Sequence, residues 1–176
     1  MNRQRFLLVA SFPDSLIQFR GPLIDALLEA GNDVHVAVPD SAPGGEVAVA
    51  LASKGVRVHG IPLQRTGLNP IRDLKLLLSL VALMLRLRPR FVLSYTIKPV
   101  VYGSIAAWLV GVKHRFALVT GLGYAFTGTA SGKRALLRRL IQRLYRFALK
   151  RTHRVFFQNP DDEALFRELR LLPEIV

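Results

Sequence analysis

The second half of the chain carries the stretch that limits the fold most tightly. Residues 91–93 form a short apolar run typical of a strand, and an apolar helix is predicted over residues 100–110. Pro99 opens this helix, which suits a first helical turn because proline has no N–H to leave unpaired there. Residues 116–119 predict a second buried strand, and residues 121–123, Gly-Leu-Gly, then turn the chain sharply. A strand, a helix and a second strand in this order are typical of a parallel sheet.

The rest of the chain repeats this alternation of strands and helices. Strands are predicted at residues 5–10, 34–38, 56–61 and 154–157, and helices at residues 16–30, 46–54, 71–88, 133–150 and from 160 onward. Short, continuously apolar strands between helices indicate a sheet that is covered on both faces. We therefore predict an α/β fold, with a Rossmann-like, mainly parallel sheet in one domain, 1–176. The longest helix, 71–88, is expected to expose part of its apolar surface.

Polar residues and glycines follow two of the predicted strands, at the edge where an open parallel sheet binds its ligands. The residues expected at this carboxyl edge are Thr96, Lys98, Thr120, Gly121, Gly123 and Tyr124. Arg20, early in the first helix, should lie near the same edge. Arg20 and Lys98 could be solvated surface residues, or they could contact phosphate or sugar. The second interpretation is open because a diphosphate needs such charges near a helix N-terminus.

Several familiar active-site patterns are missing from the sequence. Residues 11–19 lack the G-x-G-x-x-G pattern of dinucleotide-binding folds, and residues 127–134 depart twice from the phosphate-binding P-loop. No serine has a G-x-S-x-G context. The four histidines are scattered without i, i+4 spacing, so no metal site is predicted, and there is no cysteine for disulfides or thiolate zinc sites. Nicotinamide or flavin binding, nucleotide hydrolysis and serine hydrolysis are therefore disfavoured, and no cofactor is implied.

The predicted helix over residues 133–150 carries much of a net charge of +13, and no acid lies between residues 132 and 151. At 100° per residue, the basic residues of this helix lie on one arc: Arg134, Arg138, Arg139, Arg143, Arg146 and Lys150. The apolar residues of the helix lie on the opposite arc: Leu136, Leu137, Leu140, Ile141, Leu144, Phe147 and Ala148. A solvated outer face would explain the amphipathicity but not the single sign of charge. The sign favours an anionic membrane surface, whereas nucleic acid is not expected, because no recognition motif accompanies the charge.

No stretch of the sequence is long and apolar enough to predict a transmembrane segment. The apolar run after the basic start covers residues 6–10 and is too short for a signal peptide. The longest apolar-dominated run, residues 76–85, falls well below the roughly 20 residues of a spanning helix. We therefore expect a cytoplasmic protein that lies peripherally on the inner face of the cytoplasmic membrane.

Five segments carry a resemblance to a known family. They are residues 94–99 (SYTIKP), 102–103 (YG), 120–127 (TGLGYAFT), 19–20 (FR) and 157–162 (FQNPDD). Together they resemble the N-terminal domain of bacterial family-4 glycosyltransferases, which have the GT-B fold. The resemblance is to the subgroup that builds capsule, O-antigen and lipid-linked glycan precursors on undecaprenyl diphosphate, and it spans nearly the whole chain.

The resemblance implies one half of a GT-B fold, the half that binds the acceptor. The implied reaction is retaining transfer of a sugar from a UDP-sugar to a polyprenyl-diphosphate-linked saccharide, without a required metal. Carried over by motif, the substrate-binding residues are Phe19, Arg20, Thr96, Lys98, Tyr102, Gly121, Gly123 and Tyr124, while the catalytic residues stay unassigned.

The resemblance also implies a second, donor-binding domain, and residues 160–176 would form the last helix and the start of the connection to it. The 176-residue chain is then expected to be inactive alone, and UDP-sugar would reach it through the missing C-terminal domain. The alternative is a non-catalytic, basic α/β module that docks on an anionic membrane or on nucleic acid.

Overall fold

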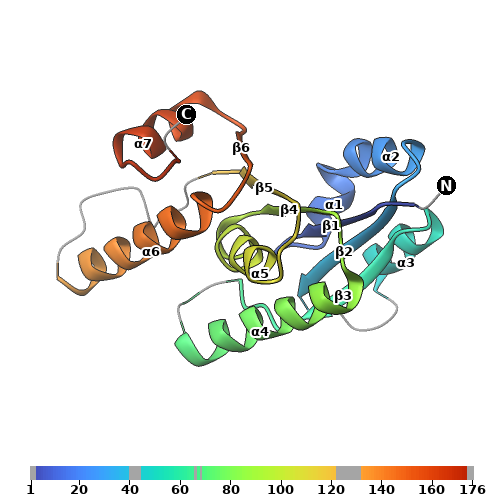
Figure 1. Cartoon of the computed structure of the whole chain (residues 1–176), viewed down its shortest axis with the longest axis horizontal. Helices are drawn as coiled ribbons and strands as arrows, with labels where there is room; N and C mark the ends of the chain where they lie inside the picture. The colour runs from blue at the N-terminus through green and yellow to red at the C-terminus, as the bar shows by residue number, and fades with distance from the viewer. Residues whose placement is uncertain (1–2, 40–44, 66, 68, 122–131, 174–176) are drawn as a thin grey trace.

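The computed structural model describes residues 3–39, 45–65, 67, 69–121 and 132–173. In this part of the chain, one parallel sheet has the strand order β3-β2-β1-β4-β5-β6. The strands are β1 (Arg5–Val9), β2 (Asp33–Pro39), β3 (Arg57–Ile61), β4 (Phe91–Tyr95), β5 (His114–Val119) and β6 (Arg154–Phe157). The order places β1 and β4 at the centre, and the chain crosses from β3 back to β4 through the longest helix (Figure 1). The predicted α/β fold with a parallel sheet is confirmed.

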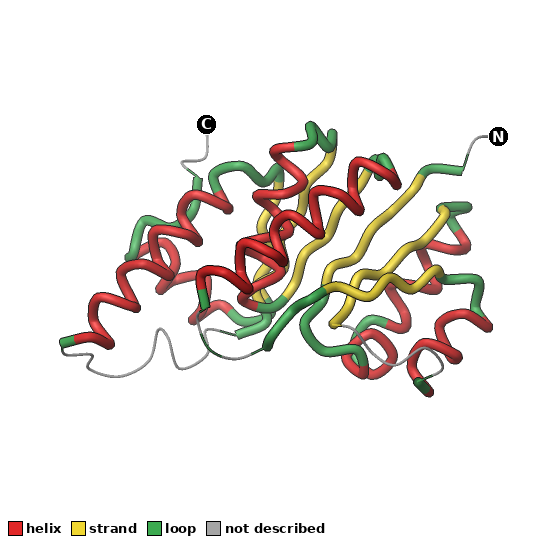
Figure 2. Tube along the Cα trace, turned by 90° about the horizontal axis from the view of Figure 1, so that it is seen from below, coloured by secondary structure: helices red, strands yellow, loops and turns green. Residues whose placement is uncertain are grey.

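Helices cover both faces of this sheet (Figure 2). They are α1 (Asp14–Gln18), α2 (Gly21–Glu29), α3 (Glu46–Ser53), α4 (Pro70–Leu87), η1 (Pro99–Gly103), α5 (Ser104–Leu109), α6 (Lys133–Leu149) and α7 (Pro160–Glu168). Side chains of α1, α2 and α3 pack on one face, and those of α4 and α5 pack on the other. Helices α6 and α7 cover the outer strands β5 and β6 on the same face of the sheet as α5.

The two sides of β1 show why its sequence forms a central strand. Leu7 and Val9 contact α4 and α5 in one core, whereas Leu8 packs with α1, α2 and α3 in the other. Successive side chains of a strand point to opposite faces, so a strand between two helical layers must be apolar at every position. Each of these three side chains is fully buried.

The helix predicted over residues 16–30 is two helices in the structure. α1 ends at Gln18, and α2 begins at Gly21 with Pro22 in its first turn. Proline has no N–H to continue the hydrogen bonds of α1, so its place is at the start of a new helix. The break leaves Phe19 and Arg20 at the junction between the helices.

The helix predicted after Pro99 begins with a π-helical turn, η1, and continues as α5. Gly103 in this turn lies directly against β4, where an added Cβ would collide with Ser94 Oγ and lie 3.3 Å from Ser94 Cβ. Any side chain at position 103 would therefore require Ser94 or η1 to shift. β5 also begins two residues earlier than predicted, at His114.

α4 confirms the expectation that the longest helix exposes apolar side chains. Leu76, Leu80 and Met84 are buried against the sheet, whereas the outward-facing Ile71, Leu74, Leu78 and Leu85 are exposed. Asn69 begins the helix, and its side-chain oxygen accepts hydrogen bonds from the backbone N–H groups of Ile71 and Arg72.

Candidate functional site

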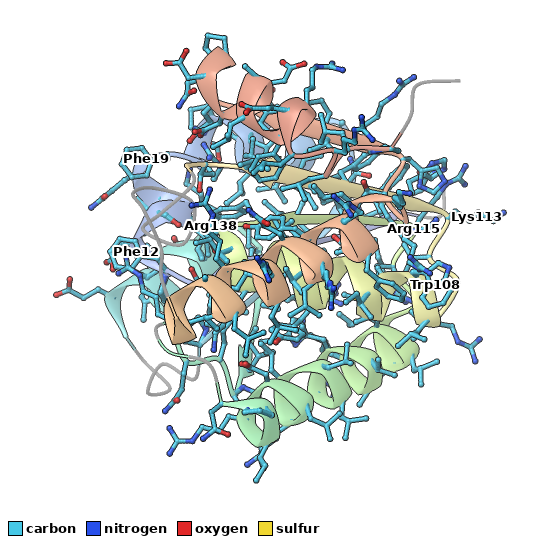
Figure 3. The ribbon with its side chains drawn as sticks, turned by 90° about the vertical axis from the view of Figure 1, so that its left-hand side faces the viewer. Phe12, Phe19, Trp108, Lys113, Arg115 and Arg138 are labelled. Carbon is cyan, nitrogen blue, oxygen red and sulfur yellow. The ribbon has the colours of Figure 1, made fainter. Side chains whose placement is uncertain are left out.

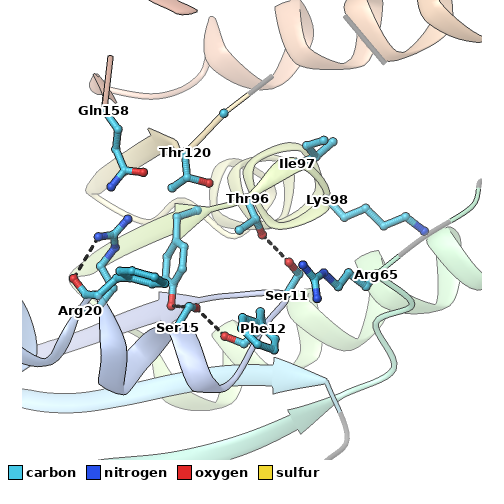
Figure 4. Close-up of a pocket in the computed structure, with 13 residues that line it drawn as sticks. Ser11, Phe12, Ser15, Arg20, Arg65, Thr96, Ile97, Lys98, Thr120 and Gln158 are labelled. Carbon is cyan, nitrogen blue, oxygen red and sulfur yellow. Dashed lines mark hydrogen bonds between the residues drawn. The ribbon is translucent and has the colours of Figure 1, made fainter. Parts of the chain in front are cut away.

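A cavity of about 560 Å³ opens at the carboxyl edge of the sheet (Figure 4). It lies beyond the ends of β1, β4, β5 and β6, with α1 and the β3–α4 connection at its sides. The lining residues are Ser11, Phe12, Ser15, Phe19, Arg20, Arg65, Tyr95, Thr96, Ile97, Lys98, Thr120, Gly121 and Gln158. Concave sites with a few polar groups are typical of small-ligand binding, and this edge is where parallel sheets bind ligands.

The structure brings most of the predicted edge residues together in this cavity. Those that line it are Phe19, Arg20, Thr96, Lys98, Thr120 and Gly121. Tyr102 is absent from the lining residues and instead lies half-buried beside Asp73. Gly123 and Tyr124 lie outside the described residues.

Hydrogen bonds join the ends of two neighbouring strands at the cavity wall. The hydroxyl oxygens of Ser11, after β1, and Thr96, after β4, are 2.7 Å apart. Ser15 Oγ donates to the carbonyl of Phe12 and lies 3.0 Å from the hydroxyl of Tyr95. Burial raises the pKa of Tyr95. Thr96 has φ +71°, a left-handed conformation that is uncommon for a residue with a branched side chain and that occurs in functional loops.

Two arginine side chains in the cavity lie over aromatic rings. The guanidinium carbon of Arg20 is 5.2 Å from the ring centre of Tyr95, and that of Arg65 is 4.8 Å from the ring centre of Phe12. Such contacts hold a guanidinium plane in place through cation–π attraction. Arg20 also donates to the carbonyl of Phe19 over 3.1 Å.

The third cation of the cavity, Lys98, is neutralised by an acid. Lys98 Nζ donates to Asp73 Oδ1 over 2.7 Å, and both side chains are buried. Burial raises the pKa of Tyr102 to about 12, and the charge of Asp73 and a hydrogen bond to it act in the same direction. Lys98 was predicted from its place after a strand, but sequence spacing gave no sign of the carboxylate that pairs with it.

Sequence reasoning missed seven lining residues: Ser11, Phe12, Ser15, Arg65, Tyr95, Ile97 and Gln158. Ser11 and Gln158 closely follow β1 and β6, so the carboxyl-edge rule applied to every strand would have found both. Arg65 lies in the connection between β3 and α4, four residues after the strand ends. No local pattern marks it, because the crossover connection alone brings it to the cavity.

The histidines, expected to be scattered, form one close pair. His35 Nδ1 and His59 Nε2 are 2.8 Å apart, and Asp33 Oδ2 lies 3.2 Å from the other ring nitrogen of His35. Burial, His35, Arg86 and Arg57 lower the pKa of His59 to about 4. Neither histidine lines the cavity. Among the described residues, no group of three or more His, Cys, Asp or Glu side chains could hold a metal ion.

The basic helix α6 divides its faces differently from the prediction. Figure 3 shows this helix with its side chains, among them Arg138. Tyr145, Ala148 and Leu149 are buried, whereas Leu136, expected on the apolar side, is 70% exposed. Leu140 and Phe147 are exposed as well, because the helix is buried on an arc centred near Tyr145. Apolar and basic side chains therefore share one solvent-facing surface.

We define the outer face of α6 by its exposed residues Leu136, Arg139, Leu140, Arg143, Phe147 and Lys150. Arg146 is also exposed, but its guanidinium donates to the carbonyls of Leu169 and Arg170 at the end of α7. Arg138 is partly buried, and the side chain of Arg134 lies outside the described residues. Of the helices that the structure describes, none is long and apolar enough to cross a bilayer.

Residues 20–175 match the family described as glycosyl transferase 4-like domain. Over 157 residues the chain is 32% identical to N,N'-diacetylbacillosaminyl-diphospho-undecaprenol alpha-1,3-N-acetylgalactosaminyltransferase of Campylobacter jejuni. This match covers 89% of the chain but 40% of that protein, so the chain spans less than half the length of this relative.

Solved structures share the fold at low sequence identity. The crystal structure of MurG from Acinetobacter baumannii matches with a TM-score of 0.57 and 16% identity, over 90% of this chain and 41% of that chain. UGT73P12 from Glycyrrhiza uralensis, complexed with glycyrrhetinic acid 3-O-monoglucuronide, matches with a TM-score of 0.53 and 14% identity, over 98% and 48%. These likenesses confirm the Rossmann-like α/β fold, and the family match confirms the resemblance found in the sequence. The chain belongs to the glycosyl transferase 4-like family.

Proposed function

We propose that this chain is the acceptor-binding part of a glycosyltransferase that moves a sugar from a UDP-sugar to a polyprenyl-diphosphate-linked saccharide. The observation that carries the proposal is the cavity at the carboxyl edge, which combines cationic and aromatic side chains. The name of the Campylobacter relative supports the same substrate class, since it describes transfer to a sugar linked to diphospho-undecaprenol. We further propose a retaining reaction, as the family resemblance implies.

The lining of the cavity suits both the diphosphate and the saccharide of such an acceptor. Arginine side chains offer planar, bidentate donors for phosphate oxygens. The ring of Phe19, 64% exposed at the cavity, offers an apolar face for a sugar ring. Thr96, Thr120 and Gln158 add polar groups that could orient sugar hydroxyls.

We propose that transfer also requires a donor-binding part. The Campylobacter relative is long enough to contain one, since the match covers 40% of it. Holding two substrates in register lowers a barrier by roughly 7–11 kcal/mol, and an acceptor-binding part cannot supply this positioning for both. The chain by itself should therefore bind the acceptor without transferring sugar to it.

We propose an anionic membrane surface as a further partner, contacted by the outer face of α6. Exposed Leu136, Leu140 and Phe147 lie among Arg139, Arg143 and Lys150 on this face. A helix that presents both apolar and basic side chains gains from burial at the headgroups and from attraction to anionic lipid. A lipid-linked acceptor would bring the protein to such a surface.

Calorimetric titration of the chain tests the main proposal with two ligands. We expect binding of a short-chain polyprenyl-diphosphate-linked N-acetylhexosamine and little or no binding of UDP-N-acetylgalactosamine. Tighter binding of the UDP-sugar than of the lipid-linked sugar would contradict the assignment to the acceptor. A radiolabel assay with both substrates should give no transfer by the chain alone, and turnover would overturn that part of the proposal.

A further inference from the structure

In the described part of the chain, the cavity is lined by two cations without a carboxylate partner and by one that is paired. Among the described residues, no acid forms an ion pair with Arg20 or Arg65, while Lys98 is paired with buried Asp73. A buried ion pair gains much of its attraction from close contact, and removal of one member leaves a costly unpaired charge. Lys98 is therefore held by Asp73, and the positive charge that remains for a ligand belongs to the two arginines.

The two arginines reach the cavity from separate parts of the chain. Arg20 lies at the junction of α1 and α2, and Arg65 lies in the β3–α4 connection. Figure 4 shows them at opposite sides of the cavity, with Phe12 and Ser15 between them. A ligand that contacted both would have to carry negative charge at two places.

The donors of Arg20 are incompletely used. One of its terminal nitrogens donates to the carbonyl of Phe19, but its buried Nε has no hydrogen-bond partner among the residues that the structure describes. A buried donor without a partner costs free energy, and such groups often mark a place where a ligand or water binds. The Tyr95 and Phe12 rings hold the guanidinium groups of Arg20 and Arg65 without consuming their N–H donors.

We propose that Arg20 and Arg65 together bind a diphosphate group between them, and that Lys98 does not contribute a free charge to this site. The proposal rests on the proposed function only in naming the lipid-linked acceptor as the source of the diphosphate. A guanidinium fork matches phosphate oxygens bidentately, and two forks from opposite sides suit the two phosphates of a diphosphate. The neutral Lys98–Asp73 pair joins η1 to the first turn of α4 and thereby fixes the helix that follows the Arg65 connection.

Titration calorimetry with inorganic pyrophosphate tests the site without any sugar transfer. Arg20→Gln and Arg65→Gln should each weaken pyrophosphate binding at least tenfold, and Arg65→Lys should lose less because it keeps the charge. Arg154→Gln is the matched control, since this exposed arginine begins β6 at the opposite edge of the sheet, and it should change affinity less than twofold. Circular dichroism at each titration temperature verifies that the variants are folded, and Arg20→Lys replaces Arg20→Gln if the latter is not.

Two further ligands identify the source of the diphosphate. Farnesyl diphosphate represents the lipid-linked acceptor, and UDP represents the nucleotide donor. We expect farnesyl diphosphate to bind more tightly than UDP, with both losing affinity in the two arginine variants. Tighter binding of UDP would keep the diphosphate site but overturn its assignment to the acceptor.

The inference and the proposed function can fail separately. Pyrophosphate affinity that is unchanged in Arg20→Gln and Arg65→Gln, or that falls equally in Arg154→Gln, would overturn the inference. If those variants still bound the lipid-linked sugar, the proposed function would stand without it. Loss of pyrophosphate binding in both variants, in a chain that never binds the lipid-linked sugar, would support the site and contradict the function.

Discussion

Lys98 Nζ lies 2.7 Å from Asp73 Oδ1, and the exposed fractions of the two side chains are only 10% and 8%. Lys98 immediately precedes η1, whereas Asp73 lies in the first turn of α4, so the ion pair joins two elements that are 25 residues apart. Tyr102, within η1, forms a hydrogen bond to the same carboxylate. Of these three residues, Lys98 lines the cavity, and its pairing with Asp73 neutralises one of the cations there.

Asp73→Asn should destabilise the fold strongly, because it leaves the buried Lys98 ammonium without its counter-charge. Breaking a buried pair by removing one partner costs about 3–5 kcal/mol. The control is Asp25→Asn, which breaks the exposed Lys54–Asp25 pair and should cost about 0–1 kcal/mol. Urea unfolding of both variants measures the difference, and equal losses of stability would show that the Lys98–Asp73 pair is not effectively buried.

The candidate site could be predicted in part from the sequence. The carboxyl-edge rule and the family motifs led to Arg20, Thr96, Lys98 and Gly121, which all line the cavity. Arg65 and the partner of Lys98 could not be found this way, because both depend on where α4 and the connection before it lie in space. The carboxyl-edge rule does not say which residue of a longer loop reaches the cavity, so it does not single out Arg65, four residues after β3.

Gly103→Ala should destabilise the fold by about 1–3 kcal/mol, the usual cost of an extra methyl group in a packed interior. The new Cβ would collide with Ser94 Oγ, which is buried and has no hydrogen-bond partner in the described part of the chain. The double variant Ser94→Ala/Gly103→Ala should recover part of the loss, so the two changes should not be additive.

Gly21→Ala is the control for this pair, since no heavy atom lies within 4 Å of a Cβ added at Gly21. It should change the unfolding free energy little. Thermal unfolding of these three variants and of Ser94→Ala provides the measurement, and strict additivity of the Ser94 and Gly103 changes would contradict the close packing of η1 on β4.

Acidification should destabilise the fold through His59. Its pKa is lowered in the fold from 6.5 to about 4, with burial as the largest cause, followed by His35, Arg86 and Arg57. Between these two values the unfolded chain binds more protons than the folded chain, so stability falls as the pH drops from about 6.5 to 4. Asp33 is the acid of this cluster, with its Oδ2 3.2 Å from His35 Nε2.

Denaturant unfolding at several pH values tests this prediction with His59→Gln. The variant should lose less stability than the parent chain over the same pH interval. His153→Gln is the comparison: its pKa is also lowered, but His153 is more exposed, so its substitution should flatten the pH dependence less. A parent chain and a His59 variant with the same pH dependence would refute the role of His59.

Binding to anionic vesicles should depend on the outer face of α6. Substitution of Arg139, Arg143 and Lys150 by glutamine removes three exposed charges. At roughly 1 kcal/mol for each basic residue near the surface, affinity for phosphatidylglycerol vesicles should fall about 100-fold. Salt should weaken binding by the parent chain, since exposed charges are screened beyond about 10 Å at 0.1 M.

A charge-matched control separates this face from net charge. Arg88, Arg90 and Lys113 are exposed near the amino edge of the sheet, and their substitution by glutamine removes the same total charge. This control should bind vesicles nearly as the parent does. Equal losses in both triple variants would show that net charge alone drives binding.

The fold was predicted more completely than the surface. Apolar strands separated by helices suffice for a parallel sheet. The helix expected from residue 160 onward is α7, which Asn159 caps by accepting from the N–H of Asp162 over 2.8 Å. Helix periodicity, however, cannot tell which arc of an amphipathic helix is covered. The placement of Leu136 and Leu140 in solvent follows from tertiary packing of Tyr145, and no single-helix pattern contains that information.

Photo-crosslinking tests most directly where the acceptor binds. A polyprenyl-diphosphate-linked N-acetylhexosamine with a diazirine on its sugar is irradiated with the chain, and the labelled residues are mapped by mass spectrometry. The account predicts adducts at the cavity, on peptides that carry Phe19, Thr96 and Thr120, and their loss with excess unlabelled acceptor. Adducts confined to the groove at the opposite edge, around Phe6, Asn32 and Phe91, would contradict it.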